Sequence, residues 1–309
     1  MFLAKEESKR PTKAVIAAAG FGTRFLPQTK AMPKEMLPLI DRPIIQIVVE
    51  ELASAGIKDI IIVGSSNKRA IEDHFGETNQ DLLGNLLAGG EKKKPLISEL
   101  NRVANLANFL YVRQKGPYGN ATPLLSAASI IGDEPFIYTF ADDFFQSTPS
   151  RTEQLIATNQ QYGGSVYAAK LVNSDDEYAR YGIVAGEPVA EGTMKVSHIV
   201  EKPGKEAAPS NLASVSSYLF DGPEILHRIE AAAETHDPTQ GEFTVQPIMQ
   251  QMINDGHNFF AREITGGKYY DTWDKLGYLE TVFDFALESP EYGPQLREYL
   301  KKKLQETND

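Results

Sequence analysis

Residues 13–27 read KAVIAAAGFGTRFLP, and this stretch decides the fold class of the chain. Its first six residues, Lys13–Ala18, form an apolar run that predicts a short buried strand, and a loop rich in Gly, Thr and Pro follows. Helical spacing over 43–55 ends at Gly56, a natural helix stop, and a second apolar strand is expected at 59–63. Two strand–helix units in succession predict an α/β fold built on a parallel sheet.

The rest of the chain changes from strand–helix units to hairpins. A short helix is expected at 67–75, with Ser66 or Asn67 as its N-cap, and a polar, helical insertion fills 76–108. The pattern predicts further strands at 109–113, 135–140, 163–170, 182–185, 195–201 and 214–220, and further helices at 223–234, 242–254, 278–287 and 294–304. Because the middle has few long helices, we expect a mixed sheet there, and the lack of an internal repeat indicates one compact unit.

The composition excludes several classes of function. The balance of 41% hydrophobic and 24% charged residues is typical of a soluble globular protein. The lack of cysteine excludes disulfides and thiolate metal sites, and no two of the five histidines have the spacing of a zinc-protease helix. A net charge of −11 argues against nucleic-acid binding. The N-terminus has no apolar core of a signal peptide and no apolar run could span a bilayer, so we expect a cytoplasmic protein without a membrane partner.

The loop after the first strand is the first candidate binding site. Gly20 and Gly22 let the backbone approach a phosphate, at the place where an open α/β sheet binds ligands. It lacks the Gly-Lys-Ser/Thr of a P-loop and the third glycine of a dinucleotide fingerprint. Three cations, Arg24, Lys30 and Lys34, indicate an anionic ligand in an otherwise acidic protein. The alternatives are a plain tight turn and a solvated basic loop.

The extended motif resembles the signature of a known family. The loop with Gly20, Gly22, Thr23 and Arg24, followed by PKEMLP at 33–38, is similar to the signature of the sugar-nucleotide pyrophosphorylases, which are nucleotidyltransferases. Within that family, the KEMLP form is nearest to the bacterial UTP–glucose-1-phosphate uridylyltransferases, and PSNLA at 209–213 favours the same branch. The resemblance runs from about residue 13 to 278. It implies a Rossmann-like, three-layer α/β nucleotidyltransferase fold with a mixed central sheet.

The resemblance assigns the nucleotide and metal sites. Gln114 lies between an expected strand and helix, and its amide can both donate to and accept from a uracil edge, although a surface amide is the alternative. Asp142 follows an apolar strand, a common position for a magnesium ligand; Asp143 could take that role instead, or Asp142 could cap a following helix. The family's pattern implies nucleotide contacts from Ala19, Gly20, Gly22, Thr23, Gln114 and Gly119, and Mg²⁺ held by Asp142 and Asp271.

The resemblance also assigns the sugar side and the phosphate contacts. Gly182 and Glu201 would bind the sugar, while Lys202 would hold the attacking phosphate and Arg24 and Lys34 the leaving phosphates. An exposed ion pair on an edge strand is the alternative for Glu201 and Lys202. The sequence departs from its relatives at Asn120 and at Trp273, beside the base and sugar contacts.

The implied activity joins UTP to glucose-1-phosphate, giving UDP-glucose and pyrophosphate, in a homodimer or homotetramer. We expect one nucleotidyltransferase domain over 1–287, with a nucleotide half at about 13–145 and a sugar half at about 146–272, and a helical tail at 288–309. Two alternatives remain open: another sugar-1-phosphate nucleotidyltransferase, such as a thymidylyltransferase, or a non-catalytic sugar-nucleotide-binding relative that regulates a partner.

Overall fold

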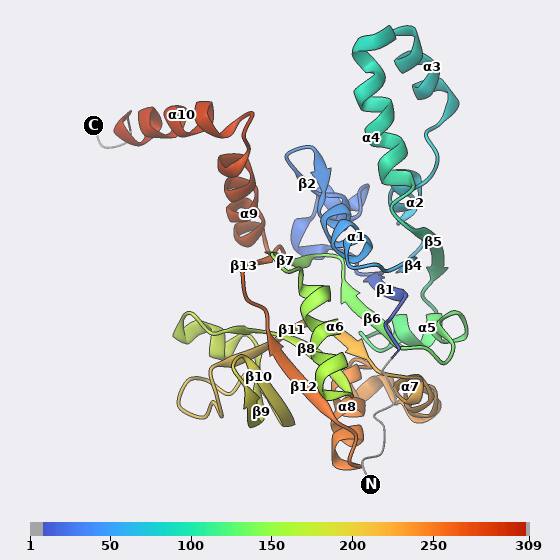
Figure 1. Cartoon of the computed structure of the whole chain (residues 1–309), viewed down its shortest axis with the longest axis vertical. Helices are drawn as coiled ribbons and strands as arrows, with labels where there is room; N and C mark the ends of the chain where they lie inside the picture. Colours follow the sequence, from blue (N-terminus) through green and yellow to red (C-terminus); the bar gives the residue numbers. More distant parts are fainter. Residues whose placement is uncertain (1–8, 307–309) are drawn as a thin grey trace.

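A computed structural model describes residues 9–306 of the chain, which fold around one large mixed sheet (Figure 1). The strand order is β5-β4-β1-β6-β11-β8-β12-β10-β9. Their bounds are β1 Lys13–Ala18, β4 Asp59–Gly64, β5 Asn108–Arg113, β6 Phe136–Phe140, β8 Ser165–Leu171, β9 Gly182–Ala190, β10 Thr193–Glu201, β11 Leu212–Phe220 and β12 Phe259–Glu263. The first four strands of that order are parallel to one another, whereas β11 is antiparallel to both of its neighbours, β6 and β8.

Two helical layers cover the sheet. Alternate residues of β1 and β4 enter separate hydrophobic clusters: Ile16 and Ile60 pack on one face, Val15 and Ile61 on the other. The first cluster takes side chains from α1 (Ile44–Ser54), α2 (Arg69–Phe75) and α6 (Arg151–Tyr162), and the second from α5 (Thr122–Ile131), α7 (Glu224–Thr235) and α8 (Val245–Asn254). The predicted fold class, a mixed central sheet between two helical layers, is confirmed.

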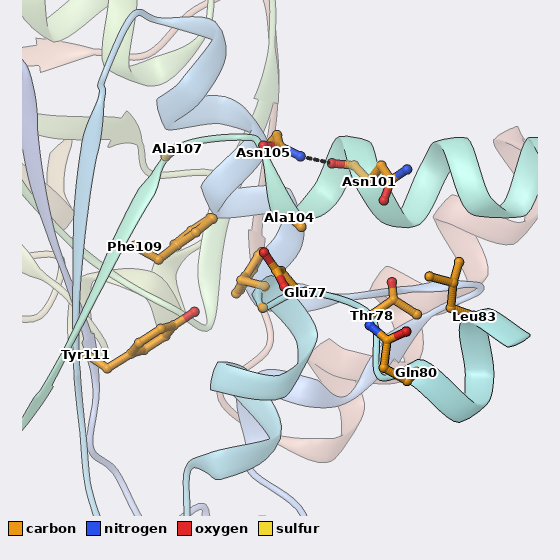
Figure 2. Close-up of a pocket in the computed structure, with 12 residues that line it drawn as sticks. Glu77, Thr78, Gln80, Leu83, Asn101, Ala104, Asn105, Ala107, Phe109 and Tyr111 are labelled. Carbon is orange, nitrogen blue, oxygen red and sulfur yellow. Dashed lines mark hydrogen bonds between the residues drawn. The ribbon is translucent and has the colours of Figure 1, made fainter.

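Two helical segments stand away from this core (Figure 1). The insertion holds α3 (Gln80–Ala88) and α4 (Lys94–Ala104), and the C-terminal segment holds α9 (Lys275–Glu288) and α10 (Gly293–Glu306). A cavity of about 560 Å³ lies under the insertion, against Phe109 and Tyr111 of the edge strand β5 (Figure 2). None of the predicted site residues lines this cavity, so it is separate from the site described below.

Some sequence-based boundaries were wrong. The helix expected from residue 67 begins at Arg69, and its N-cap is Lys68, which makes no side-chain cap bond, rather than Ser66 or Asn67. The helix expected from 242 begins at Val245. Asp142 does not precede a helix: the chain enters β7 (Asp143–Ser147), which pairs with β13 (Gly267–Asp271) in a two-stranded ribbon that the sequence did not predict.

None of the helices within residues 9–306 has both the length and the apolar character that crossing a bilayer requires.

Candidate active site

The predicted site residues gather at the carboxyl edge of the parallel strands. Gly20 lies in the loop after β1, Gln114 follows β5, and Asp142 follows β6. Because β1, β4, β5 and β6 are parallel and in register, the ends of these strands meet at one side of the sheet. Open α/β sheets bind ligands at this edge.

The glycine loop packs closely against Lys34. Gly22 has a left-handed backbone, with φ of 64°, just before the 3₁₀ turn Thr23–Phe25. A Cβ atom on Gly22 would lie 3.1 Å from Cβ of Lys34, and one on Gly20 would lie 3.5 Å from its Cε. A larger residue at Gly22 would therefore be both strained and crowded.

Lys34 joins this loop to Asp142. Its Nζ donates to Asp142 Oδ2 in a short ion pair, and both side chains are largely shielded from solvent. Burial lowers the pKa of Lys34, but the carboxylates of Asp142, Glu35 and Asp143 together outweigh it, so the pKa lies above its usual value. Lys34 is therefore a fixed cation at the point where the triphosphate and the metal are expected.

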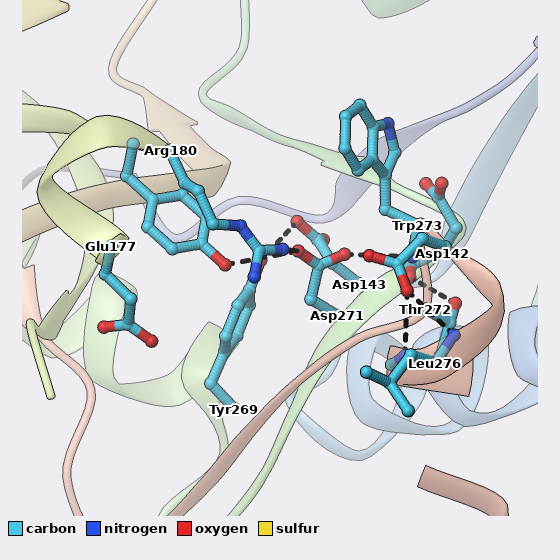
Figure 3. A network of polar contacts seen from close by, with 12 residues as sticks. Asp142, Asp143, Glu177, Arg180, Tyr269, Asp271, Thr272, Trp273 and Leu276 are labelled. Carbon is cyan, nitrogen blue, oxygen red and sulfur yellow. Dashed lines mark hydrogen bonds and ion pairs between the residues drawn. The ribbon is translucent and has the colours of Figure 1, made fainter. Parts of the chain in front are cut away.

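The β7–β13 ribbon brings Asp271 to the same place, because Asp271 pairs directly with Asp143. Just beyond the ribbon, the N–H and the hydroxyl of Thr272 both donate to the carbonyl of Asp142, at 3.1 and 2.6 Å. Figure 3 shows Asp142, Asp143 and Asp271 gathered in one network. Residues about 130 positions apart in the sequence are thus placed side by side.

Asp271 is held from three sides. Its Oδ2 accepts from the hydroxyl of Tyr181 at 3.2 Å and from Arg180 at 3.4 Å, while its Oδ1 accepts from the N–H of Trp273 at 3.0 Å. Burial raises the pKa of Asp271, although the N–H of Trp273 opposes this, and the nearby Asp142 raises it further. The negative charge of Asp142 beside Asp271 favours a cation shared by the two carboxylates.

Asp143, the alternative metal ligand, faces the interior. It is 6% exposed, its Oδ2 accepts from Tyr269 at 3.1 Å, and its Oδ1 lies 3.7 Å from Nη1 of the fully buried Arg151. Burial raises the pKa of Asp143 to about 7, and the charge of Arg151 opposes that rise. Its partners suit a role in holding the ribbon beneath the site.

The predicted sugar-binding residues lie on β9 and β10 and just after β10. Gly182 pairs with Glu201, and a Cβ on Gly182 would lie 3.1 Å from Oε2 of Glu201. Lys202 has a left-handed backbone, with φ of 46°, and its N–H donates to the carbonyl of Tyr181. This turn lets Lys202 Nζ lie 3.4 Å from Glu201 Oε1, and both side chains are exposed. The alternative for these two residues was an exposed ion pair on an edge strand. The ion pair is present, but β10 is not an edge strand, since it lies between β9 and β12.

The segment of Gln114 and Gly119 is tied to α8. The N–H of Gln114 donates to Gly64 at the end of β4. Gly119 has φ of 149°, and a Cβ there would lie 2.0 Å from the carbonyl oxygen of Phe243. Asn120 accepts from the N–H of Val245 and donates to the side chain of Gln246, which explains this departure from the relatives as a cap on the first turn of α8.

The other departure, Trp273, also has a partner. The guanidinium of Arg24 lies 3.5 Å from the centre of the Trp273 ring, in a cation–π contact. Through this contact and the N–H bond to Asp271, Trp273 connects the glycine loop to the aspartate pair.

The two aspartates fit a magnesium ion. Mg²⁺ usually takes one or two carboxylates and completes its octahedron with water and substrate phosphates, and Asp142 and Asp271 supply such a pair. Among residues 9–306, no group of three or more carboxylate, histidine or cysteine side chains could hold a metal by itself. The donor set therefore fits an ion that is bound together with a phosphorylated substrate.

A nucleotide-binding fold with this loop, cation and aspartate pair defines a class of transferase. The chain matches the family model for nucleotidyl transferases over residues 13–290, so it belongs to the nucleotidyl transferase family. It is 41% identical, over 298 residues, to the UTP–glucose-1-phosphate uridylyltransferase of Bacillus subtilis (strain 168), with 96% of this chain and 98% of that protein covered. The resemblance read from the motifs is confirmed.

Solved structures agree with this membership. The UTP-bound UGPase from Acinetobacter baumannii superposes with a TM-score of 0.80 at 30% identity, over 94% of this chain and 98% of that one. A UDP-glucose pyrophosphorylase complexed with UDP-glucose gives a TM-score of 0.76 at 33% identity, over 89% and 98% of the two chains.

Proposed function

We propose that the protein transfers a uridylyl group from UTP to glucose-1-phosphate, giving UDP-glucose and pyrophosphate. The observation that carries this proposal is a continuous row of contacts from the glycine loop to the sugar side. Lys34 joins the loop to Asp142, Asp271 lies beside Asp142, and Tyr181 joins Asp271 to the strand pair that holds Glu201. The similarity to the uridylyltransferase of Bacillus subtilis supports the choice of UTP and glucose-1-phosphate.

The reaction exchanges one phosphorus–oxygen bond for another. A phosphate oxygen of glucose-1-phosphate attacks the α-phosphorus of UTP, the bond to the bridging oxygen breaks, and pyrophosphate leaves. The attacking phosphate is largely ionised at neutral pH, since its second pKa is about 6, so no general base is needed. Catalysis then depends on positioning and charge neutralisation.

Each part of the row has its own role. The triphosphate is bound by backbone N–H groups of the glycine loop, from Ala19, Gly20, Gly22 and Thr23. The base is contacted by Gln114 and Gly119. Arg24 and Lys34 hold the phosphates that leave, and Lys202 holds the phosphate that attacks. Gly182 and Glu201 bind the sugar hydroxyls. Mg²⁺, held by Asp142 and Asp271, would neutralise charge on the triphosphate.

Product analysis tests this proposal. With UTP, glucose-1-phosphate and Mg²⁺, the protein should release pyrophosphate and UDP-glucose in equal amounts, and with UDP-glucose and pyrophosphate it should form UTP. Because both substrates are cytoplasmic metabolites, we also propose a cytoplasmic location. Binding of UDP-glucose without turnover in either direction would instead identify a non-catalytic relative.

We propose that the C-terminal helices form the interface of a homodimer or a dimer of dimers. Leu276, Leu279 and Phe283 of α9 are between 47% and 66% exposed, on helices that project from the core (Figure 1). Phe285 of the same helix is buried and packs on Phe144, so it belongs to the core and not to this surface.

Light scattering at micromolar concentration should therefore give at least twice the 34 kDa mass of one chain. The double variant Leu276→Glu/Leu279→Glu should lower the measured mass, because charges on the apolar faces oppose association. The control Val189→Glu, at an exposed position of β9, should not. A 34 kDa species for the unaltered protein would contradict the proposal.

A further inference from the structure

Two buried side chains hold the carbonyl groups of the glycine loop. Lys68 Nζ donates to the carbonyl oxygen of Gly20 at 2.6 Å, and Thr29 Oγ1 donates to that of Gly22 at 2.6 Å. Lys68 and Thr29 are each only 3% exposed, so both donors reach the loop from the protein side. Neither residue is among the site residues that the motifs identify.

Lys68 is kept in the interior by a second buried charge. Its Nζ donates to both carboxylate oxygens of Glu35, at 2.8 and 3.0 Å, and Glu35 is fully buried. A buried ion pair adds little stability, because apolar residues of similar volume often serve as well. Stability alone therefore does not account for the Lys68–Glu35 pair. Lys68 also makes a third contact, with the carbonyl of Gly20 in the loop.

The two bonds set the direction of the loop's peptide groups. In a trans peptide the carbonyl and the following N–H point to opposite sides. The carbonyl of Gly20 is held by Lys68, and that of Gly22 by Thr29 and by the N–H of Phe25 at 3.0 Å, so the N–H groups of Phe21 and Thr23 point away from these donors. N–H groups of one loop that point to the same side can bind an anion.

We propose that Lys68, with Glu35 as its counter-ion, and Thr29 are positioning residues that preset the glycine loop for the triphosphate. They act through the backbone and touch no substrate. This inference rests on the proposed function, because it assumes that a nucleoside triphosphate binds at this loop. A loop whose peptides are already turned toward the phosphates loses less conformational freedom on binding.

Thr29 gives the cleanest test, because valine has nearly the same shape and lacks only the hydroxyl. Thr29→Val should weaken UTP binding by about 5- to 10-fold in calorimetry without the sugar phosphate, as expected for one lost positioning hydrogen bond. Thr29→Ser keeps the donor and should bind UTP like the unaltered protein. In steady-state kinetics, Thr29→Val should raise KM for UTP while kcat at saturation stays the same.

The matched control is Thr158→Val. It also removes a buried hydroxyl, which donates to the carbonyl of Gln154 in α6 at 2.9 Å, away from the loop. It should lower the thermal unfolding temperature about as much as Thr29→Val and leave UTP binding unchanged. If the two variants bound UTP equally well, Thr29 would have only a structural role.

Lys68 requires a paired change, because Lys68→Met alone would leave Glu35 buried without its partner. The double variant Glu35→Met/Lys68→Met keeps the volume and should unfold within a few degrees of the unaltered protein. Its UTP binding should be at least about 10-fold weaker, since the Gly20 carbonyl has lost its donor. UTP binding by the folded double variant at the original affinity would overturn the inference. Failure of the unaltered protein to bind UTP would instead refute the proposed function.

Discussion

Replacing Asp142 with asparagine is expected to lower turnover by at least about 100-fold while the protein stays folded, because transition-state charge stabilisation is lost. Its carbonyl is held by the N–H and hydroxyl of Thr272, so the backbone should keep its place when the carboxylate becomes an amide. The measurement is kcat at saturating substrates and Mg²⁺, together with the thermal unfolding temperature.

Asp143→Asn is the companion variant, because Asp143 was the alternative metal ligand. Its contacts with Arg151 and Tyr269 predict a change in stability with most of the turnover retained. Near-normal turnover in Asp142→Asn, combined with a large loss in Asp143→Asn, would move the metal site to Asp143.

The second large effect is expected at Lys202. Lys202→Met removes the cation that steadies the attacking phosphate, so turnover should fall by about 10- to 100-fold, and by the same factor with every sugar-1-phosphate. The left-handed backbone of Lys202 turns its side chain to the same side as that of Glu201, which allows separate roles for two adjacent residues. Calorimetry with UTP alone should show unchanged binding.

Glu201→Gln is the matched change for the sugar. It keeps the shape but weakens the charge-assisted hydrogen bonds to the hydroxyls, so it should reduce discrimination between glucose-1-phosphate and its epimers by roughly 1–3 kcal/mol. Ratios of kcat/KM for two epimers measure this. The roles assigned to Glu201 and Lys202 would be wrong if Lys202→Met abolished UTP binding and otherwise changed only the selectivity between sugar-1-phosphates.

The sequence predicted the parallel half of the fold well because local pattern decides it. The apolar run Lys13–Ala18 coincides with β1, and β4 and β6 were placed within one residue of their ends. The missed helix α6 had a readable start, since Ser150 and Glu153 form a capping box. The ribbon of β7 and β13 had no such signal: its strands are short, and each exists through a partner more than a hundred residues away.

In the candidate site too, local sequence pattern identifies some residues, whereas others depend on contacts between distant segments. The positions of Gly20, Arg24, Lys34 and Asp142 follow from one motif and one strand end, so sequence reading could select them. Lys68 could not be found this way, because its role depends on burial beneath a loop 48 residues earlier. The proposed division into a nucleotide half at about 13–145 and a sugar half at about 146–272 stays a prediction.

The proposed substrates of the protein are UTP and glucose-1-phosphate. The most direct test is a coupled pyrophosphate-release assay with UTP, dTTP, CTP and ATP against several sugar-1-phosphates. Its predicted result is the highest kcat/KM for the pair of UTP and glucose-1-phosphate. A preference for dTTP or for another sugar-1-phosphate, or no pyrophosphate with any pair, would show that UTP and glucose-1-phosphate are not its substrates.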